Sequence, residues 1–444
     1  MRRLTTTLLL VVVLAGLGGY IYYLEQRDPA AEADSNENAF DVESDQIQEL
    51  RIAVADGDTT VARRTDTQWQ LVEPVEADAD TSELNNMATT LASLGVQRVV
   101  DENPGDLAQF GLAQPKIEVA FRTSAEGEPQ RLQVGDRTPT GGDVYAKKAG
   151  ENRVFLVSGI VEDTFRRTAF DLRNKTVLAF DRDKVDGLEI VRGRETLQFS
   201  RKGADWTVVQ PATMRADYAA IEGLITSLQA TQATKFVTQE PTPQELREYG
   251  LTQPRTSASI LMGGDRVTLQ LGTTVNAETY ARNAARPGVV MVAPTVVSDL
   301  AKPLDDFRRR DLFDLRSFST KRVQITRGSN AFAFEKVTAD DGTESWKNAS
   351  GATVDTVTVE DLLTKLSNLR IGSFTTGQDA ALRSPTLSVS ATFGQNKDEN
   401  RMETVTVTRS GESIVASRPD EPGTLRVEGG SGLDEIMKAL DALK

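Results

Sequence analysis

The chain has 444 residues and a formal net charge of −14, with 65 acidic against 51 basic side chains and neither cysteine nor histidine. The acidic balance disfavours nucleic acid and anionic lipid as partners. The two missing residue types exclude disulfides, thiolate or imidazole metal ligands, and every triad or dyad that needs His or Cys. Because histidine is the usual acid or base near neutral pH, we expect no enzyme, no catalytic residue, no cofactor and no metal. Carboxylate pairs and Ser-Lys arrangements are the catalytic groups that this composition still allows.

An uncharged run covers residues 4–24 near the N-terminus. At 1.5 Å per residue this run is about long enough to cross a hydrocarbon core of ~30 Å. Arg2 and Arg3 precede it and acidic residues follow it, which places the N-terminus in the cytoplasm and the rest of the chain outside. We therefore predict one transmembrane helix within residues 1–27. The protein would be a single-pass protein of the inner (cytoplasmic) membrane with a periplasmic body.

A cleaved signal peptide is the alternative for this segment. Its apolar region would be too long, and the A-x-A site at Ala31 to Ala33 lies well beyond it, so an uncleaved anchor is favoured. Residues 28–44 are acidic, rich in Ala and Asn, and have little to bury. Such a composition is typical of a flexible tether, which would hold the body just off the membrane.

One unit of about 137 residues is present three times. Trp69 and Trp206 lie 137 residues apart, as do Asp80 and Asp217, and Trp346 belongs to a third, diverged copy. The same spacing of 137 separates Pro74 from Pro211, Leu91 from Leu228 and Gly135 from Gly272. So long a period indicates tandem duplication of a small domain rather than a solenoid. We assign the units to residues 45–181, 182–314 and 315–444.

Within each unit the sequence predicts the same order of elements. Alternating apolar residues such as Leu50, Ile52 and Val54 indicate half-buried strands. In the first two units a proline follows the tryptophan strand and ends it, because proline cannot donate to a strand ladder. A helix comes next, with apolar residues at i, i+3, i+4 and i+7 in every copy. These positions are 84/87/88/91, 221/224/225/228 and 359/362/363/366.

A Gly-Leu-x-x-Pro turn then leads into further strands and a second helix. The turn begins at Gly111 and Gly250, and Leu382-Arg-Ser-Pro385 replaces it in the third unit. We expect strands at 117–121, 132–134, 144–146, 154–157, 258–260, 267–271, 279–281 and 289–292, and closing helices around 161–172, 296–307 and 433–443. Runs of strands punctuated by two helices predict an α+β fold, with antiparallel sheets covered by helices on one face.

Two recurring residue types are candidate site residues. They are Trp69, Trp206 and Trp346, and Asp80, Asp217 and Asp355. The tryptophans are suited to stacking on carbohydrate, but their shared position beside a strand favours packing. The aspartates would suit acids or ligands, but each stands four residues before the first apolar position of a helix. That placement favours helix N-caps.

Several charged or glycine-rich stretches were also weighed. Glu76-x-Asp78-x-Asp80 lacks the glycine and the closing glutamate of a calcium loop. The cluster Arg308–Arg310, with Arg166, Arg167 and Arg173 in the preceding copy, would suit phospholipid or an acidic partner; complementing a helix C-terminus is the favoured interpretation. Turns are predicted at Asp340-Asp341-Gly342, Gly141-Gly142, Gly263-Gly264 and Gly429-Gly430.

The repeated landmarks resemble the bacterial domain-of-unknown-function 4340 family. The resemblance rests on Trp206 and Pro211, Ala216-Asp217, Tyr249-Gly250-Leu251-x-x-Pro254, Leu271-Gly272, Tyr280-Ala281 and their partners in the first copy. It covers residues 45–314 well and the remainder loosely, and it carries no catalytic residues. It implies a membrane-anchored envelope protein, often encoded beside ABC-type transport components of the gliding-motility kind.

Taken together, these features lead us to expect a non-enzymatic, membrane-anchored extracytoplasmic scaffold or accessory protein of an ABC-type envelope transport complex. Its partner would be a membrane protein, and nucleic acid is not expected. The alternative is an extracytoplasmic binding module for a glycan or lipid held between repeat units. That alternative requires a concave, apolar pocket with a few converging polar groups.

Overall fold

The computed structural model describes residues 37–394 and 400–443. The predicted anchor at residues 4–24 and most of the predicted tether lie outside this range. No helix among the described residues is long and apolar enough to cross a membrane. The chain divides into two compact units between Lys175 and Thr176, so that the first repeat forms one unit and the second and third repeats together form the other.

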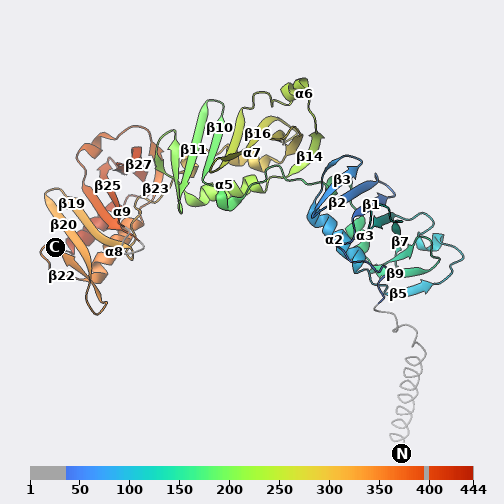
Figure 1. The fold of residues 1–444 in the computed structure, drawn as a ribbon. Helices are drawn as coiled ribbons and strands as arrows, with labels where there is room; N and C mark the ends of the chain where they lie inside the picture. The colour runs from blue at the N-terminus through green and yellow to red at the C-terminus, as the bar shows by residue number, and fades with distance from the viewer. Residues whose placement is uncertain (1–36, 395–399, 444) are drawn as a thin grey trace, which may run out of the picture. The chain divides into compact units, whose positions relative to one another are not determined.

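Each repeat contains one nine-stranded antiparallel sheet (Figure 1). In the first repeat the spatial order is β4-β3-β2-β1-β6-β7-β8-β9-β5, and the other two sheets repeat this order. The first sheet comprises β1 Glu49–Val54, β2 Thr60–Thr65, β3 Gln68–Glu73, β4 Ala77–Asp78, β5 Arg98–Asp101, β6 Ile117–Arg122, β7 Gln130–Arg137, β8 Asp143–Lys148 and β9 Val154–Ser158. The second comprises β10 Gly187–Arg192, β11 Glu195–Lys202, β12 Asp205–Gln210, β13 Met214–Arg215, β14 Ala233–Thr238, β15 Thr256–Met262, β16 Asp265–Val275, β17 Glu278–Asn283 and β18 Val289–Val292.

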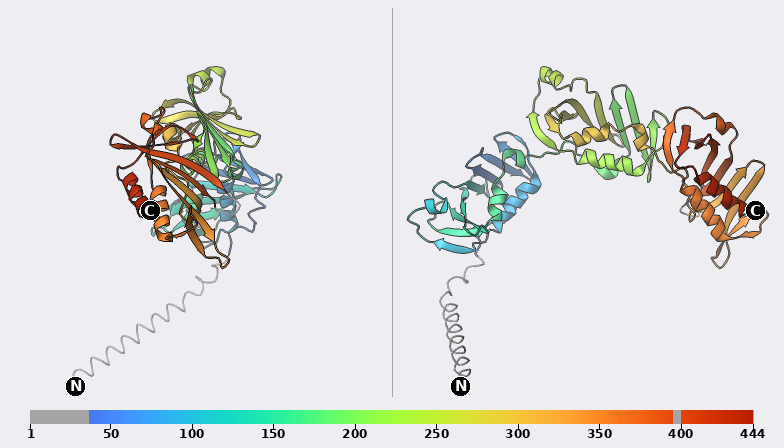
Figure 2. Two further views of the ribbon diagram at one scale, coloured as in Figure 1. Left: turned by 90° about the vertical axis from the view of Figure 1, so that its left-hand side faces the viewer. Right: turned by 180° about the vertical axis from the view of Figure 1, so that it is seen from behind.

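The third sheet comprises β19 Thr320–Arg327, β20 Asn330–Thr338, β21 Glu344–Asn348, β22 Thr353–Val354, β23 Ile371–Thr375, β24 Leu387–Phe393, β25 Arg401–Ser410, β26 Ser413–Arg418 and β27 Glu421–Val427. Helices pack on one face of each sheet, and Figure 2 shows α8 and α9 side by side on the third. The α+β prediction, with three tandem copies, is therefore confirmed. All eight strands predicted by range in the first two units are present.

The first helix of each repeat has the predicted apolar face. These helices are α2 Thr81–Ala92, α5 Tyr218–Gln229 and α8 Thr356–Ser367, and each buries the four predicted positions. The remaining helices and 3₁₀ turns are η1 Ala108–Phe110, α3 Ile160–Phe165, α4 Ala169–Leu172, η2 Arg182–Lys184, α6 Pro243–Glu248, α7 Pro294–Leu300, η3 Leu304–Phe307, η4 Ala380–Arg383 and α9 Gly432–Asp441.

The prediction of one continuous closing helix is wrong for the first two repeats. In the first, Thr168 and Asp171 form a capping box that starts α4 as a separate helix after α3. In the second, Pro303 follows α7 and precedes η3, and proline disfavours helical backbone at the residue before it. The third repeat has neither a capping box nor a proline within this segment, and α9 is continuous over 10 residues.

Part of the predicted tether belongs to the first core. Ala39 and Phe40, within residues 28–44, are buried. The Ala39 amide donates to the Leu94 carbonyl at 2.7 Å, and the Phe40 ring meets that of Phe121 edge-on at 5.0 Å. The first repeat therefore begins before residue 45, with apolar residues that lie among acidic ones in the sequence.

The same leading segment recurs in the other two repeats. Val177 and Leu178 lie in the second core, and Leu312 and Phe313 lie in the third. The amide of Val177 donates to Thr231 at 3.3 Å, as that of Leu312 donates to Leu369 at 3.0 Å. The cores therefore begin a few residues before the assigned boundaries at 182 and 315. Each leading segment is bound to the connection between the first helix and the next strand of its own repeat. No distinctive sequence pattern marks these segments.

The Gly-Leu-x-x-Pro turn depends on a second glycine in a neighbouring strand. Gly250 has φ +72°, which favours glycine, and the turn packs on Gly272 of β16. A Cβ on Gly272 would lie 2.0 Å from the Tyr249 carbonyl oxygen. In the third repeat, strand register places Thr408 at the position of Gly272. The turn and its glycine partner have therefore been lost together.

The sequence also predicts four turns and two prolines that end strands. Asp340-Asp341-Gly342 forms the predicted turn, between β20 and β21, and Gly141-Gly142 and Gly263-Gly264 lie in hairpin connections. Gly429-Gly430 does not form a hairpin, because it connects β27 to α9. The peptide bonds that precede Pro74 and Pro211 are cis, and each follows directly on the end of a strand.

Candidate functional site at the junction of the second and third repeats

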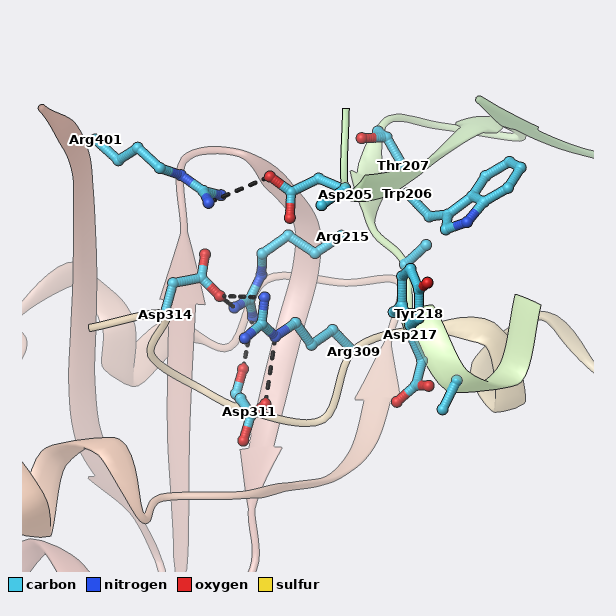
Figure 3. A pocket seen from close by; sticks show the side chains of 13 residues that line it. Asp205, Trp206, Thr207, Arg215, Asp217, Tyr218, Arg309, Asp311, Asp314 and Arg401 are labelled. Atoms are coloured by element: carbon cyan, nitrogen blue, oxygen red, sulfur yellow. Dashed lines mark hydrogen bonds and ion pairs between the residues drawn. The ribbon is translucent and has the colours of Figure 1, made fainter. Parts of the chain in front are cut away.

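The largest concentration of buried charge among the described residues lies where the second repeat meets the third. A short segment leaves the second sheet through a bridge between Arg308 and Ala216, and joins the third through a bridge between Asp311 and Arg370. A cavity of about 370 Å³ lies beside this segment, with Trp206 and the start of α5 on one side (Figure 3). The backbone thus places charged side chains from both repeats around one space.

Glu421, at the start of β27, links the two repeats most directly. Its side chain is almost wholly buried. It accepts a hydrogen bond from Arg215 Nε at 2.5 Å and another from Arg308 Nη2 at 3.0 Å. The Arg308 guanidinium also stacks over the Phe374 ring, 3.6 Å from its centroid. One carboxylate of the third repeat thus holds two arginines of the second.

Asp314 forms the next ion pairs in the same network. It accepts from Arg215 Nη1 at 2.9 Å, and it lies 3.0 Å from Arg309 Nη1 and 3.6 Å from Arg418 Nη2. Burial alone would raise the pKa of the Asp314 carboxyl, but these guanidiniums outweigh it and hold that pKa below its usual range. Asp314 is therefore a charged structural group and is not available as a general acid.

Arg418 anchors the network inside the third repeat. It is 4% exposed and donates to Glu403 at 2.7 Å and to the Leu312 carbonyl at 2.9 Å. Glu403 in turn accepts the backbone amides of Asp314 and Leu315 at 2.9 and 2.8 Å. Burial disfavours the charged form of Arg418, but its carboxylate partners prevail and raise its pKa. The leading segment of the third repeat is thereby fixed to β25 and β26.

The other charged groups lining the cavity also have partners. Asp311 accepts from Arg309 Nε at 3.3 Å and forms an ion pair with Arg370. Arg401 pairs with Asp205 at 3.2 Å across the two repeats (Figure 3). The lining is thus charged, and its acids and bases neutralise one another. This arrangement suits the joining of two domains better than acid-base chemistry.

The favoured interpretation of the Arg308–Arg310 cluster is wrong, and so is its exposed alternative. Arg308 is 6% exposed and faces Glu421. Arg309 pairs with Asp311 and Asp314. Arg310 donates to the Gly372 carbonyl at 2.9 Å. The three side chains join the second repeat to the third. The sequence did not indicate this role, because the acidic partners lie up to 113 residues away.

The recurring tryptophans and aspartates have the structural roles predicted for them. All three tryptophans are buried, and Asp217 caps α5 by accepting from the Ala220 amide at 2.9 Å. Asp80 and Asp355 cap α2 and α8 in the same way. In the second repeat the indole Nε1 of Trp206 donates to Glu222 of α5 at 2.9 Å. No group of three or more acidic side chains among the described residues is placed to hold a metal ion.

A comparison of equivalent positions would have revealed the junction. Arg418 donates to the Leu312 carbonyl, and at the equivalent place Asn283 donates to the Val177 carbonyl at 3.3 Å. Asp314 of the third repeat likewise corresponds to Ala179 of the second. At these two positions the third repeat therefore has charged residues where the second has neutral ones. This difference between copies was the available signal.

The described chain is thus an α+β repeat protein whose second and third repeats are joined by a buried ion-pair network. The family described as Domain of unknown function (DUF4340) matches residues 69–241 and 206–386. These segments cover more than half of the chain, which therefore belongs to this family. Both segments begin at the repeated tryptophan and run into the following repeat, so the family pattern includes the connection between repeats.

Among solved structures, matches include the DNA polymerase sliding clamp from Pseudomonas aeruginosa with ligand, at 10% identity over 88% of this chain and 93% of that one, with a TM-score of 0.16. The DNA polymerase III subunit beta from the same organism matches at 11% identity over 85% and 91%, with a TM-score of 0.17. A putative subunit from Eubacterium rectale matches at 8% identity over 88% and 93%, with a TM-score of 0.17. Scores this low support no inference about fold or function. No curated protein matches the chain.

Proposed function

We propose that this chain is a non-enzymatic, membrane-anchored extracytoplasmic scaffold or accessory protein of an ABC-type envelope transport complex. The observation that carries the non-enzymatic part is the junction between the second and third repeats. There Glu421, Asp314 and Glu403 are each bound by arginines or backbone amides. Carboxylates held in this way stabilise a domain arrangement, because the arginines and backbone amides keep them charged and fixed in place.

The anchor and the partner class rest on other observations. The uncharged run at residues 4–24, with arginines before it and acids after it, supports a single-pass membrane protein with its body outside. Membership of the family supports a role in the cell envelope, since members resemble envelope proteins linked to ABC-type transport components. The second and third repeats, joined into one unit, offer a surface for a protein partner, and the first repeat forms the other unit.

Binding of a glycan or lipid between repeats is less well supported. A cavity does lie between the second and third repeats, but it is lined mainly by paired charges such as Arg309 with Asp311 and Arg401 with Asp205. Small-molecule sites are usually lined by apolar and aromatic groups with a few polar ones. The lining therefore favours a structural role for this space.

The test is copurification from native membranes after mild crosslinking. The full chain and an unrelated single-pass protein with a periplasmic body are tagged and expressed at equal levels. We expect subunits of an ABC-type transporter to be enriched with the full chain relative to the control. Enrichment of no membrane protein above the control would contradict the scaffold proposal.

A further inference from the structure

A second charged cavity lies in the first repeat, where β1 begins and β2 and β6 end. Its volume is about 380 Å³, and its lining includes Glu49, Arg63, Arg64, Arg122 and Ser124. Unlike the junction, this cavity has two arginine side chains, Arg63 and Arg122, against one carboxylate, Glu49. The local charge is therefore positive, in a chain whose net charge is −14.

Strand register places two of the arginines on either side of the one acid. Glu49 is opposite Arg63 on β2 and opposite Arg122 on β6. It accepts from Arg63 Nε at 2.8 Å and lies 3.7 Å from Arg122 Nη1. Arg64 lies on the other face of the strand, where it donates to the backbone carbonyls of Ser44 and Asp45 and to Asn85 Oδ1 and lies over the Trp69 ring. One carboxylate thus serves two arginines, and the third is bound by neutral oxygens.

Arg122 also carries an unsatisfied donor. Its Nε is buried and has no hydrogen-bond partner. A buried donor on a charged group that lacks an acceptor is costly. An acceptor supplied from outside the protein would remove this cost. An oxyanion would do so while also offsetting the excess positive charge.

The fold itself does not require these three residues. In the second repeat Gly187 occupies the position of Glu49, and its strand partners are Ser200 and Leu261. In the third repeat Arg322 occupies that position, and its strand partners are Glu335 and Thr392. The second set is uncharged and the third is a simple exposed ion pair. At this register position, two arginines flank one acid in the first sheet and in neither of the other two.

We propose that this cavity binds a phosphate-type oxyanion, either free or as the headgroup of a phospholipid. Guanidinium groups present paired N–H donors that match phosphate oxygens, and the Ser124 hydroxyl adds a further donor at the rim. Because the chain as a whole is acidic, attraction is local and weakens as salt is added. The proposal rests on the geometry of the first repeat alone and does not depend on the scaffold role.

The first test is calorimetric titration of the full chain, in non-ionic detergent, with inorganic phosphate. We expect saturable binding that Arg122→Gln or Arg63→Gln weakens by at least about tenfold, since each removes a charge-assisted contact to the anion. Glu49→Gln should instead tighten binding, because it removes the competing carboxylate. Misfolding cannot produce this opposite effect.

The matched control is Arg266→Gln in the second repeat. Arg266 also pairs with a glutamate on the sheet, Glu189 at 2.8 Å, and it is half exposed. The Arg266→Gln variant should bind phosphate as the wild-type chain does. Absence of saturable binding by the wild-type chain, or equal binding by wild type and Arg122→Gln, would overturn the proposal. Either result would indicate that water satisfies the Arg122 donor.

A second measurement identifies the source of the anion. The full chain is placed in nanodiscs of phosphatidylglycerol or phosphatidylcholine, and backbone hydrogen exchange is followed at residues 48–49 and 122–125. Protection in phosphatidylglycerol but not phosphatidylcholine, lost in Arg122→Gln, would support a lipid headgroup. Protection only when inorganic phosphate is added would support a free anion. Protection by neither contradicts the site.

Discussion

At the scale of single residues, the repeated aspartates act through the backbone of the helices they precede. Asp217→Ala should lower the free energy of unfolding by about 1 kcal/mol, because the Ala220 amide loses its acceptor. Denaturant unfolding of the full chain measures the change, and Asp217→Asn, which keeps an acceptor, is the control. Partner capture should be unchanged. Loss of partner capture at unaltered stability would show that Asp217 belongs to a binding site.

Asp314 links stability to pH, also at the scale of one side chain. Burial opposes its ionisation, but Arg215, Arg309 and Arg418 lower its pKa in the folded state below the unfolded value of about 3.9. A lowered folded pKa contributes stability that is fully present above the unfolded pKa and is lost as pH falls through the folded one. Wild type should therefore exceed Asp314→Asn in unfolding free energy at pH 7. This difference should shrink as the pH falls below about 4. A constant difference from pH 7 to pH 3 would contradict the ion-pair account.

At the scale of elements, the Gly-Leu-x-x-Pro turn and the strand beneath it form one packing unit. Gly272→Ala should lower the unfolding free energy by about 3 kcal/mol, because the added methyl would meet the Tyr249 carbonyl oxygen. Gly223→Ala is the control, since Gly223 lies within α5 and an added Cβ meets nothing within 4 Å. That change should stabilise the protein by about 1 kcal/mol. Equal effects of the two substitutions would rule out the close approach.

Elements were predictable where their causes are local. The apolar face of α5 follows from spacing within 12 residues, and its cap from the single Asp217 before it. The division of the closing helices was missed although its causes, Thr168 with Asp171 and Pro303, are also local. The leading segment around Phe40 was missed because its burial depends on Phe121, which is distant in sequence.

The ion-pair junction and the basic cavity could not be predicted from one copy of the unit. Arg308 and Glu421 are 113 residues apart, and only the packing of one sheet beside the next brings them together. Arg63 and Arg122 become neighbours only through their register with Glu49. Both sites lie at positions where the copies differ. Residues shared by all copies instead serve the fold, as the caps and buried tryptophans do.

At the scale of the whole molecule, the chain has two compact units, and the second contains two repeats held together by Glu421. Glu421→Ala should lower the stability of the second unit by about 3 kcal/mol, because it leaves the buried Arg308 without its closest carboxylate and removes one of the two that bind Arg215. Scanning calorimetry of the full chain should show the transition of the second unit shifted down and that of the first unchanged. Glu335→Ala, which breaks the half-exposed pair with Arg322 in the third repeat, is the control and should cost at most about 1 kcal/mol. If the two variants shift the same transition equally, the buried network does not hold the repeats together. A downward shift confined to Glu421→Ala would mean that the buried network makes the second and third repeats unfold as one body.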